Sequence, residues 1–309
     1  MRKLTIFYGV PISVNNTWDI NKAARYFMYY DTIVLGANLQ DPEHEEYTST
    51  KEIIRIIKRE KARMEIFGYI DIGVTTNDYS LDKIFKMIND WKVLNVDGLL
   101  LDNCGFINET PRERLNAVVD YAHDHGLKVM VNSWSIDDVL SDEVEPLYNP
   151  KGLKSHITAG DYYLNESFVV NTVAYKDNDG FQDTLDIKIK SERAIRYRVT
   201  KGIKIAAIGI IRYHDFLNEK IEFYFKMMET LALIYSYDSY GISDYMYAAT
   251  SAALKFPKYF EPKCDIYSIN PLDEIKINKE LTEWNRRTDC HSFLVHIDNS
   301  KKEYYYKIE

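Results

Sequence analysis

The stretch VDGLLLDNCGF, at residues 96–106, is an apolar run that ends abruptly on a carboxylate. Strands of a parallel sheet are covered on both faces, so they are apolar along most of their length. A polar residue directly at the carboxyl end of such a strand is therefore the position at which chemistry is expected. The stretch predicts a buried parallel strand that carries Asp102, followed by Asn103, at its functional end.

Similar apolar, β-branched runs alternate with segments of helical period along most of the chain. The expected strands lie at residues 4–10, 32–40, 64–73, 96–103, 127–134, 161–170, 203–213 and 238–244. Helices are expected near 20–29, 49–64, 80–94, 110–126, 185–201 and 218–237. Eight strand and helix pairs in alternation predict an α/β fold, a closed (β/α)₈ TIM barrel. No GxGxxG follows any strand, which argues against a dinucleotide-binding sheet.

The tail of the chain departs from this alternation. Residues 291–309 predict two strands around a DNSK turn, which is a hairpin appended to the barrel. We therefore expect a catalytic barrel over residues 1–260 and a C-terminal extension over 261–309 that packs on it. The long segment 135–160 is expected as a βα insertion that shapes the cleft at the catalytic face.

Composition excludes several classes of protein. The 309 residues carry a formal net charge of −8 and show no basic stripe, so nucleic acid is not expected as a partner. No apolar run is long enough to span a membrane, and the first 16 residues read as a strand rather than a signal peptide. The three cysteines match no metal-binding pattern, and their odd number argues against a disulfide framework.

Polar side chains stand near the carboxyl end of every expected strand, where a barrel would bring them to one face. In strand order they are Tyr8, Asn38, Asp71, Asp102, Asn132, Glu166, Arg212, Tyr240 and Asp244. Any one of them could equally be a satisfied polar group at the barrel rim. For Asp102 alone, capping of the neighbouring helix is an equal alternative.

Considered as a pair, Asp102 and Glu166 favour a functional role over a structural one. They come from the fourth and sixth strands, and neighbouring strands are about 4.8 Å apart. The two carboxyls can therefore face each other across a gap of about 5 to 9 Å, the working separation of a glycosidase pair. Such a pair needs unequal environments, with one carboxyl protonated and the other ionised.

The motifs VDGLLLDN, GYIDIG and LNESF resemble the barrel glycosidases of glycoside hydrolase family 114 and the related spherulin-4-like proteins over roughly residues 64 to 170. The resemblance implies an endo-acting hydrolase of an α-linked amino-sugar polymer that needs no cofactor and is extracellular. Asp102 falls on the family's catalytic aspartate, Glu166 on its glutamate and Asp71 on a position that lines its cleft. By analogy with barrel α-glycosidases, Asp102 is expected as nucleophile and Glu166 as general acid/base, although the roles could be reversed.

Asp71 and the remaining strand-end residues are expected to bind the sugar. The latter are Tyr8, Asn38, Asn132, Arg212, Tyr240 and Asp244. Four acidic groups, Asp71, Asp102, Glu166 and Asp244, would give the cleft a charge that suits a cationic sugar.

Two other function classes stay open. One is a barrel without catalysis that binds a glycan as part of a cell-surface or viral structure. The other is a metal-dependent hydrolase, for which the sequence offers few ligands. His123 and His125 fall at the end of a helix, on the face of the barrel opposite to the strand ends, and His214 has no partner at ligand spacing. No metal is therefore expected.

Overall fold

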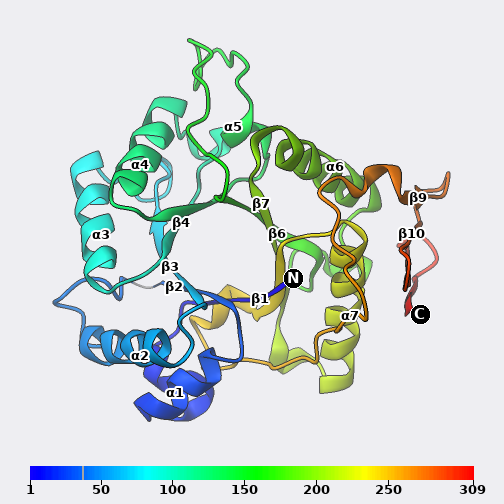
Figure 1. Ribbon diagram of the computed structural model, residues 1–309, viewed down its shortest axis with the longest axis horizontal. Helices are drawn as coiled ribbons and strands as arrows, with labels where there is room; N and C mark the ends of the chain where they lie inside the picture. The colour runs from blue at the N-terminus through cyan, green and yellow to red at the C-terminus, as the bar shows by residue number, and fades with distance from the viewer. Residues whose placement is uncertain (37) are drawn as a thin grey trace.

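The computed structural model describes residues 1–36 and 38–309 and forms a closed barrel of eight parallel strands in sequential order (Figure 1). The strands are β1 (Arg2–Phe7), β2 (Thr32–Leu35), β3 (Glu65–Asp71), β4 (Gly98–Asp102), β5 (Lys128–Asn132), β6 (Tyr162–Asn171), β7 (Lys204–Ile211) and β8 (Ser239–Asp244). All eight expected strands and the TIM-barrel fold are confirmed. The expected second strand, 32–40, includes residue 37, which lies outside the described residues.

The helices form the outer layer of the barrel (Figure 1). They are α1 (Ile20–Phe27), α2 (Tyr47–Glu60), α3 (Leu81–Val93), α4 (Arg112–Asp124), α5 (Asp137–Leu140), α6 (Thr184–Lys201) and α7 (Asn218–Ile234). Ser80 caps α3 by accepting from the backbone N–H of Lys83 at 3.3 Å. Gly126 and Gly202 follow α4 and α6 with φ of +69° and +72°, the left-handed conformation that ends a helix.

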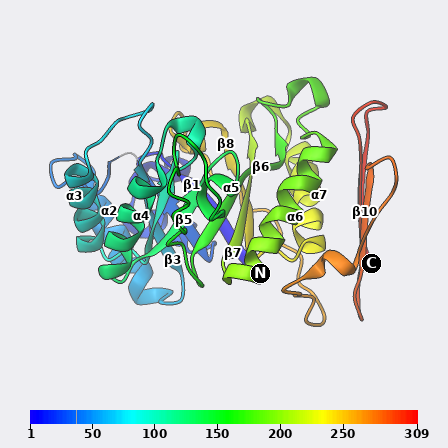
Figure 2. The ribbon, with the colours of Figure 1, turned by 90° about the horizontal axis from the view of Figure 1, so that it is seen from above.

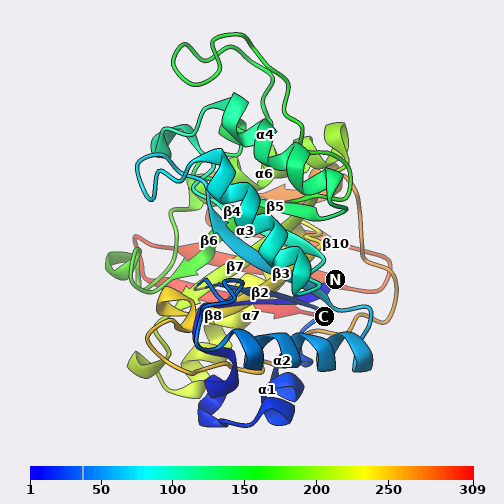
Figure 3. The same ribbon diagram turned by 90° about the vertical axis from the view of Figure 1, so that its left-hand side faces the viewer.

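The expectation of eight helices is wrong. Within the described residues no α-helix follows β8, and the chain continues through the short 3₁₀ turn η5 (Tyr245–Ala248) into an extended segment. The segment after β5 also holds little helix, because α5 has only four residues. Beyond α5 the chain extends outward past the helical layer (Figures 1 and 3). None of the described helices is long and apolar enough to span a membrane.

The centre of the barrel is filled by side chains that point inward from the strands. This inner core consists of Leu4, Ile6, Val34, Phe67, Leu100, Met130, Tyr162, Leu164, Ala206 and Ile208. Each is at most 1 % exposed, and burying an aliphatic or aromatic side chain contributes about 1.5 to 3 kcal/mol. A larger core fills the layer between the strands and the helices. The barrel is therefore a packed body whose space for a ligand can open only at an end.

The C-terminal segment forms a four-stranded antiparallel sheet in the order β12-β11-β10-β9. The predicted hairpin is confirmed as β11 (Ser292–Asp298) and β12 (Glu303–Ile308), while β9 (Ile275–Ile277) and β10 (Glu283–Arg287) were not predicted. The sheet stands against α7 on the outside of the barrel (Figure 2). Trp284 of β10 is fully buried there, and its indole N–H donates to the hydroxyl of Tyr235 at 3.1 Å.

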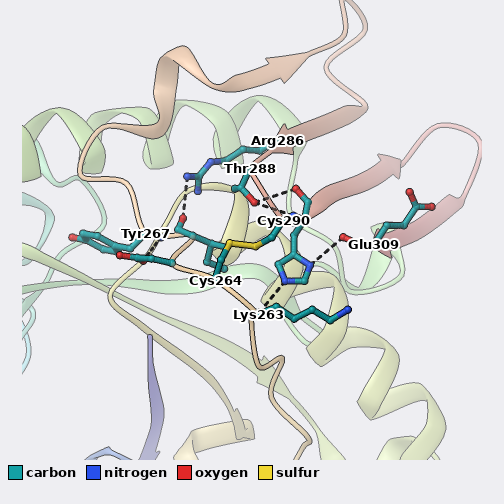
Figure 4. The surroundings of a disulfide bond; sticks show 10 residues. Lys263, Cys264, Tyr267, Arg286, Thr288, Cys290 and Glu309 are labelled. Carbon is teal, nitrogen blue, oxygen red and sulfur yellow. Dashed lines mark hydrogen bonds between the residues drawn. A yellow bond between two sulfur atoms is a disulfide. The ribbon is translucent and has the colours of Figure 1, made fainter.

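The odd number of cysteines argued against a disulfide framework, yet one disulfide is present among the described residues. Cys264 and Cys290 are bonded and tie the segment after β8 to the turn between β10 and β11 (Figure 4). The guanidinium of Arg286 reinforces this link by donating to the carbonyl of Ile266 at 3.0 Å. Cys104 is a buried free thiol beside β4 that donates to the carbonyl of Leu101 at 3.0 Å, as expected for a small packing residue.

Barrel closure tolerates no side chain at Gly241 of β8. A Cβ there would lie 1.8 Å from the backbone carbonyl oxygen of Leu4 in β1. We predict that Gly241→Ala lowers the free energy of unfolding in urea by about 3 kcal/mol, the upper range for overpacking, because a backbone atom of the closing strand pair must move. The matched control is Gly209→Ala in β7, where the nearest atom is the flexible Met228 sulfur at 3.0 Å and the loss should be about 1 kcal/mol. Equal losses would contradict this account.

Candidate active site

Asp102 of β4 and Glu166 of β6 share one hydrogen-bond donor. The side-chain amide of Asn132, which ends the intervening strand β5, donates to Asp102 Oδ1 at 3.1 Å and to Glu166 Oε2 at 2.6 Å. The distance between the two acceptor oxygens is therefore at most the sum of these two lengths, which is below about 6 Å. Both carboxyls consequently face one space at the carboxyl ends of their strands. This upper limit on the distance between one oxygen of each carboxyl is compatible with the short end of the predicted range.

The alternation of side chains along each strand accounts for this meeting. Leu100, Met130 and Leu164 belong to the inner core, and the residue two positions later points to the same side. These later residues are Asp102, Asn132 and Glu166, so the inward-facing rows emerge at the mouth of the barrel as polar groups. Tyr8 and Tyr69 follow the core residues Ile6 and Phe67 in the same way.

Asp102 sits in an environment that raises its proton affinity. Burial raises the pKa of its carboxyl to about 6, and the nearby Glu166 carboxylate adds to the increase. Three donors act in the opposite direction: the backbone N–H of Asn103 at 2.8 Å, the Asn132 amide at 3.1 Å and the Tyr69 hydroxyl at 3.1 Å. These bonds also fix the orientation of the carboxyl.

Glu166 is placed by strained backbone. The pairing of β6 with β7 shifts register between Glu166 and Asn171, and within that span Ser167 and Val169 have φ of 55° and 62°. A β-branched residue with positive φ is unfavourable, and such strain gathers at functional sites. The free oxygen of Glu166 accepts from the hydroxyl of Tyr247 in η5, where Tyr247 itself has φ of 52°.

Three tyrosines form a wall beside the pair. The ring of Tyr8 lies 4.8 Å from that of Tyr69 and 5.0 Å from that of Tyr247, measured between centroids. Burial raises the pKa of Tyr8 and of Tyr247 well above the ordinary value, so both stay neutral hydroxyls. Tyr8 was predicted from the sequence, whereas Tyr69 and Tyr247 were not. The alternation from Phe67 could have indicated Tyr69.

Two hollows meet at Glu166. The first, of about 470 Å³, is polar and is lined by Asp102, Asn103, Ile107, Asn108, Asn132, Ser133, Trp134, Tyr163, Asn165, Glu166, Ser167, Asn171, Ala174 and Lys190. The second, of about 630 Å³, is lined by Tyr8, Tyr69, Glu166, Asn171, Val173, Ala174, Ile210, Tyr245, Met246, Tyr247 and Ala249. Their shared residues make them parts of one cleft. Among its described lining residues none belongs to 135–160, so the expectation that this insertion shapes the cleft is wrong.

The structure places the other predicted acidic residues outside the cleft lining. Asp71 is buried, and its oxygens accept from Gly73 N–H, from Thr76 and from Asn77, so it organises its own loop. Asp244 accepts from the backbone N–H groups of Tyr213 and Tyr245 and from Ser251. The expected acidic cleft of four carboxylates is therefore reduced to Asp102 and Glu166.

Three further predicted residues also lie away from the pair. Tyr240 is buried and its hydroxyl donates to Glu229 of α7 at 3.1 Å, so it faces the helical layer. Arg212 packs its guanidinium 4.7 Å from the ring centroid of Tyr245 and lines neither hollow. Asn38 is exposed and lines neither hollow. Of the nine predicted residues, the structure brings together Tyr8, Asp102, Asn132 and Glu166.

The histidines take structural roles, as expected. His123 Nε2 contacts both carboxylate oxygens of Asp161, at 3.1 and 3.0 Å, and His125 Nδ1 contacts the carbonyl oxygen of Tyr121 at 2.7 Å. No group of three or more metal-ligating side chains occurs among residues 1–36 and 38–309.

Comparisons with known proteins find a similar fold but no similar sequence. No model of a known protein family and no curated protein sequence matches the chain. Among solved structures, Eubacterium rectale Amy13B is similar with a TM-score of 0.53 and 10% identity, over 97% of this chain and 86% of that one. Two further structures have lower TM-scores. Haloferax volcanii malate synthase has a TM-score of 0.47 and 12% identity, over 85% of this chain and 77% of that one. CdNal from Clostridium difficile in complex with mannosamine has a TM-score of 0.44 and 9% identity, over 78% of this chain and 70% of that one. At 10% identity, the likeness to Amy13B shows a shared fold alone.

The raised pKa of Asp102 predicts a pH-dependent stability. The pKa lies near 6 in the folded protein against 3.8 ordinarily, so the folded state binds this proton more tightly than the unfolded state. The resulting stability is present below pH 4 and is lost as pH rises through 6. Asp102→Asn removes this loss, so the free energy of unfolding of the variant, relative to wild type, should rise by about 3 kcal/mol between pH 4 and pH 8. Urea unfolding at both pH values measures this, with pH 4 as the internal control. A difference in unfolding free energy between variant and wild type that is the same at pH 4 and pH 8 would contradict this prediction.

Proposed function

We propose that the protein is a glycoside hydrolase that cleaves a polysaccharide with Asp102 and Glu166 as its catalytic pair. The observation that carries the proposal is the bridging Asn132 amide, which holds both carboxyls toward the same space within hydrogen-bonding reach. Two carboxyls at this separation, at the carboxyl ends of barrel strands, are the arrangement that hydrolysis of a glycosidic bond requires.

The upper limit of about 6 Å between the bridged oxygens favours a mechanism that retains the anomeric configuration. In that mechanism the two carboxyls lie about 5 to 5.5 Å apart, which leaves no room for a water between a carboxyl and the sugar. In the first step Asp102 attacks the anomeric carbon while Glu166 gives its proton to the glycosidic oxygen. The bond between the anomeric carbon and the glycosidic oxygen breaks. The sugar is then held as an ester of Asp102. In the second step water attacks the same carbon, passes a proton to Glu166 and releases the Asp102 carboxylate.

The two hollows support this division of roles. Asp102 lines only the polar hollow, whereas Glu166 lines both. A nucleophile must lie under the sugar unit that it will carry, and an acid must reach the oxygen that joins that unit to the next. With the retained unit in the polar hollow and the departing unit in the tyrosine-lined hollow, Asp102 and Glu166 occupy these two positions.

A polymer suits the cleft better than a small glycoside. Space continues on both sides of Glu166, and rings of Tyr8, Tyr69 and Tyr247 offer apolar faces with polar tips on the departing side. Sugar rings stack on such faces while their hydroxyls bond to the polar groups at the edge. Internal cleavage of a chain that runs through both hollows follows from this arrangement.

A second candidate is a barrel that binds a glycan without cleaving it. The tyrosine wall alone would serve that purpose. Two observations favour the enzyme: the pKa of Asp102 is raised to about 6 by burial, and the backbone that positions Glu166 is strained. Binding needs neither feature, whereas carboxyls with shifted pKa values and strained backbone gather at catalytic sites.

Replacement of either carboxyl tests catalysis directly. We predict that Asp102→Asn and Glu166→Gln each lower the release of reducing ends from a cleaved polysaccharide by at least a thousandfold, because each step requires both groups. Glu113→Gln, which changes an exposed carboxyl on α4, is the matched control and should leave the rate unchanged. Undiminished release of reducing ends by Asp102→Asn would exclude that residue from catalysis. Glycan binding by the wild-type protein without release of reducing ends would favour the binding barrel.

The roles of the two carboxyls can be separated with a 4-nitrophenyl glycoside of the released sugar. Its leaving group departs without protonation, so Glu166→Ala should form the ester at a near wild-type rate while Asp102→Ala should not. A burst of nitrophenolate in stopped-flow absorbance measures this first step. A burst in Asp102→Ala and none in Glu166→Ala would reverse the assignment.

A further inference from the structure

The cleft contains a cation opposite its carboxylates. Lys190 of α6 lines the polar hollow together with Trp134, which follows β5. Lys190 is half-buried, and burial lowers the pKa of its ammonium. Within residues 1–36 and 38–309 no carboxylate lies within 4.0 Å of it, although the charges of Asp186 and Glu166 act on it from farther away. A partly desolvated ammonium without an ion-pair partner costs stability, which points to a role with a ligand.

Trp134 has an unusual position for an indole. It is 66% exposed although it borders a cleft, and its ring lies 4.1 Å from the Lys190 nitrogen. The contact holds the ammonium over one face of the ring by a cation–π interaction. The indole and the ammonium together thus present an apolar surface with a fixed positive charge beside it.

We propose that Trp134 and Lys190 form a subsite for an anionic sugar unit, one that carries a carboxylate or a sulfate. This rests on the proposed function and names its substrate class. The sugar ring contacts the indole, and its acidic group accepts hydrogen bonds from the Lys190 ammonium. Because both residues line the hollow that Asp102 lines, the acidic unit belongs to the retained side of the cleft.

The remaining lining of this hollow consists of the carboxyls Asp102 and Glu166 and of neutral side chains. Asn103 and Asn108 supply neutral amides for sugar hydroxyls. A cationic amino sugar would instead bring an ammonium toward Lys190, which is unfavourable at close range. The acidic cleft that was expected to suit a cationic sugar included Asp71 and Asp244, which do not line the cleft. Lys190 therefore shifts the preference toward acidic sugars.

Calorimetric binding to the inactive Asp102→Asn variant tests the subsite. The probes are four α-1,4-linked tetrasaccharides of one backbone: galacturonate, sulfated galactose, galactose and galactosamine. At least one anionic tetramer should bind ten times more tightly than galactose, and the two anionic probes distinguish a carboxylate from a sulfate. Addition of Lys190→Met should abolish this advantage while leaving galactose affinity within threefold, and Lys190→Arg should preserve it.

Lys188→Met is the matched control, because Lys188 lies on the same helix, pairs with Glu192 and does not line the cleft. It should leave all four affinities unchanged. Tightest binding of galactosamine, no binding of either anionic tetramer, or an anionic advantage that survives Lys190→Met would each overturn the subsite. Release of reducing ends by wild-type protein is measured separately, so the hydrolase proposal can fail or stand independently of this result.

Discussion

The site depends on one constraint, which is that side chains on a strand alternate between the inside of a closed barrel and its helical layer. The inner core residues Leu100, Met130 and Leu164 define which positions point inward. Two residues later the same rows reach the mouth as Asp102, Asn132 and Glu166. A shift of one residue in any of these strands would send its polar group into the helical layer. The apolar packing that stabilises the barrel therefore also determines which functional groups meet.

Two carboxyls so close together repel each other when both are ionised, and the surrounding donors offset part of this cost. Asn132 donates to both, Tyr69 and the Asn103 N–H donate to Asp102, and Tyr247 donates to Glu166. Burial nevertheless holds the pKa of Asp102 near 6. The protein is thus less stable at neutral pH than it would be without this carboxyl, which is the usual relation between a strained site and its function.

The same alternation explains how far the sequence could predict the molecule. Long apolar strands and capped helices were recognisable locally, so the barrel was predictable, as was the strand-four and strand-six pair. Tyr240 failed because it shares the outward row of β8 with Ile242, which packs in the helical layer. Which residues of β8 point into the barrel could not be predicted from DSYGISD, because apolar and polar residues do not alternate in that run. Tyr247, Trp134 and Lys190 come from turns and a helix, and only tertiary packing brings them to the cleft. The bond between Cys264 and Cys290 likewise joins segments whose proximity no local pattern shows.

Asp244 shows how a wrongly assigned residue can still serve the site. It was expected to contact the sugar, yet its oxygens accept from Tyr213 N–H, Tyr245 N–H and Ser251. Tyr245 begins η5, Ser251 follows η5, and Tyr213 follows β7. The backbone of Tyr247 is held further by its carbonyl, which accepts from Tyr8 N–H at 2.7 Å. These bonds sustain positive φ at three successive residues, Met246, Tyr247 and Ala248, a conformation that costs energy in an isolated turn. The turn thereby directs the Tyr247 hydroxyl at Glu166, so the carboxylate that ends β8 acts on the pair of Asp102 and Glu166 through the loop that it holds in place.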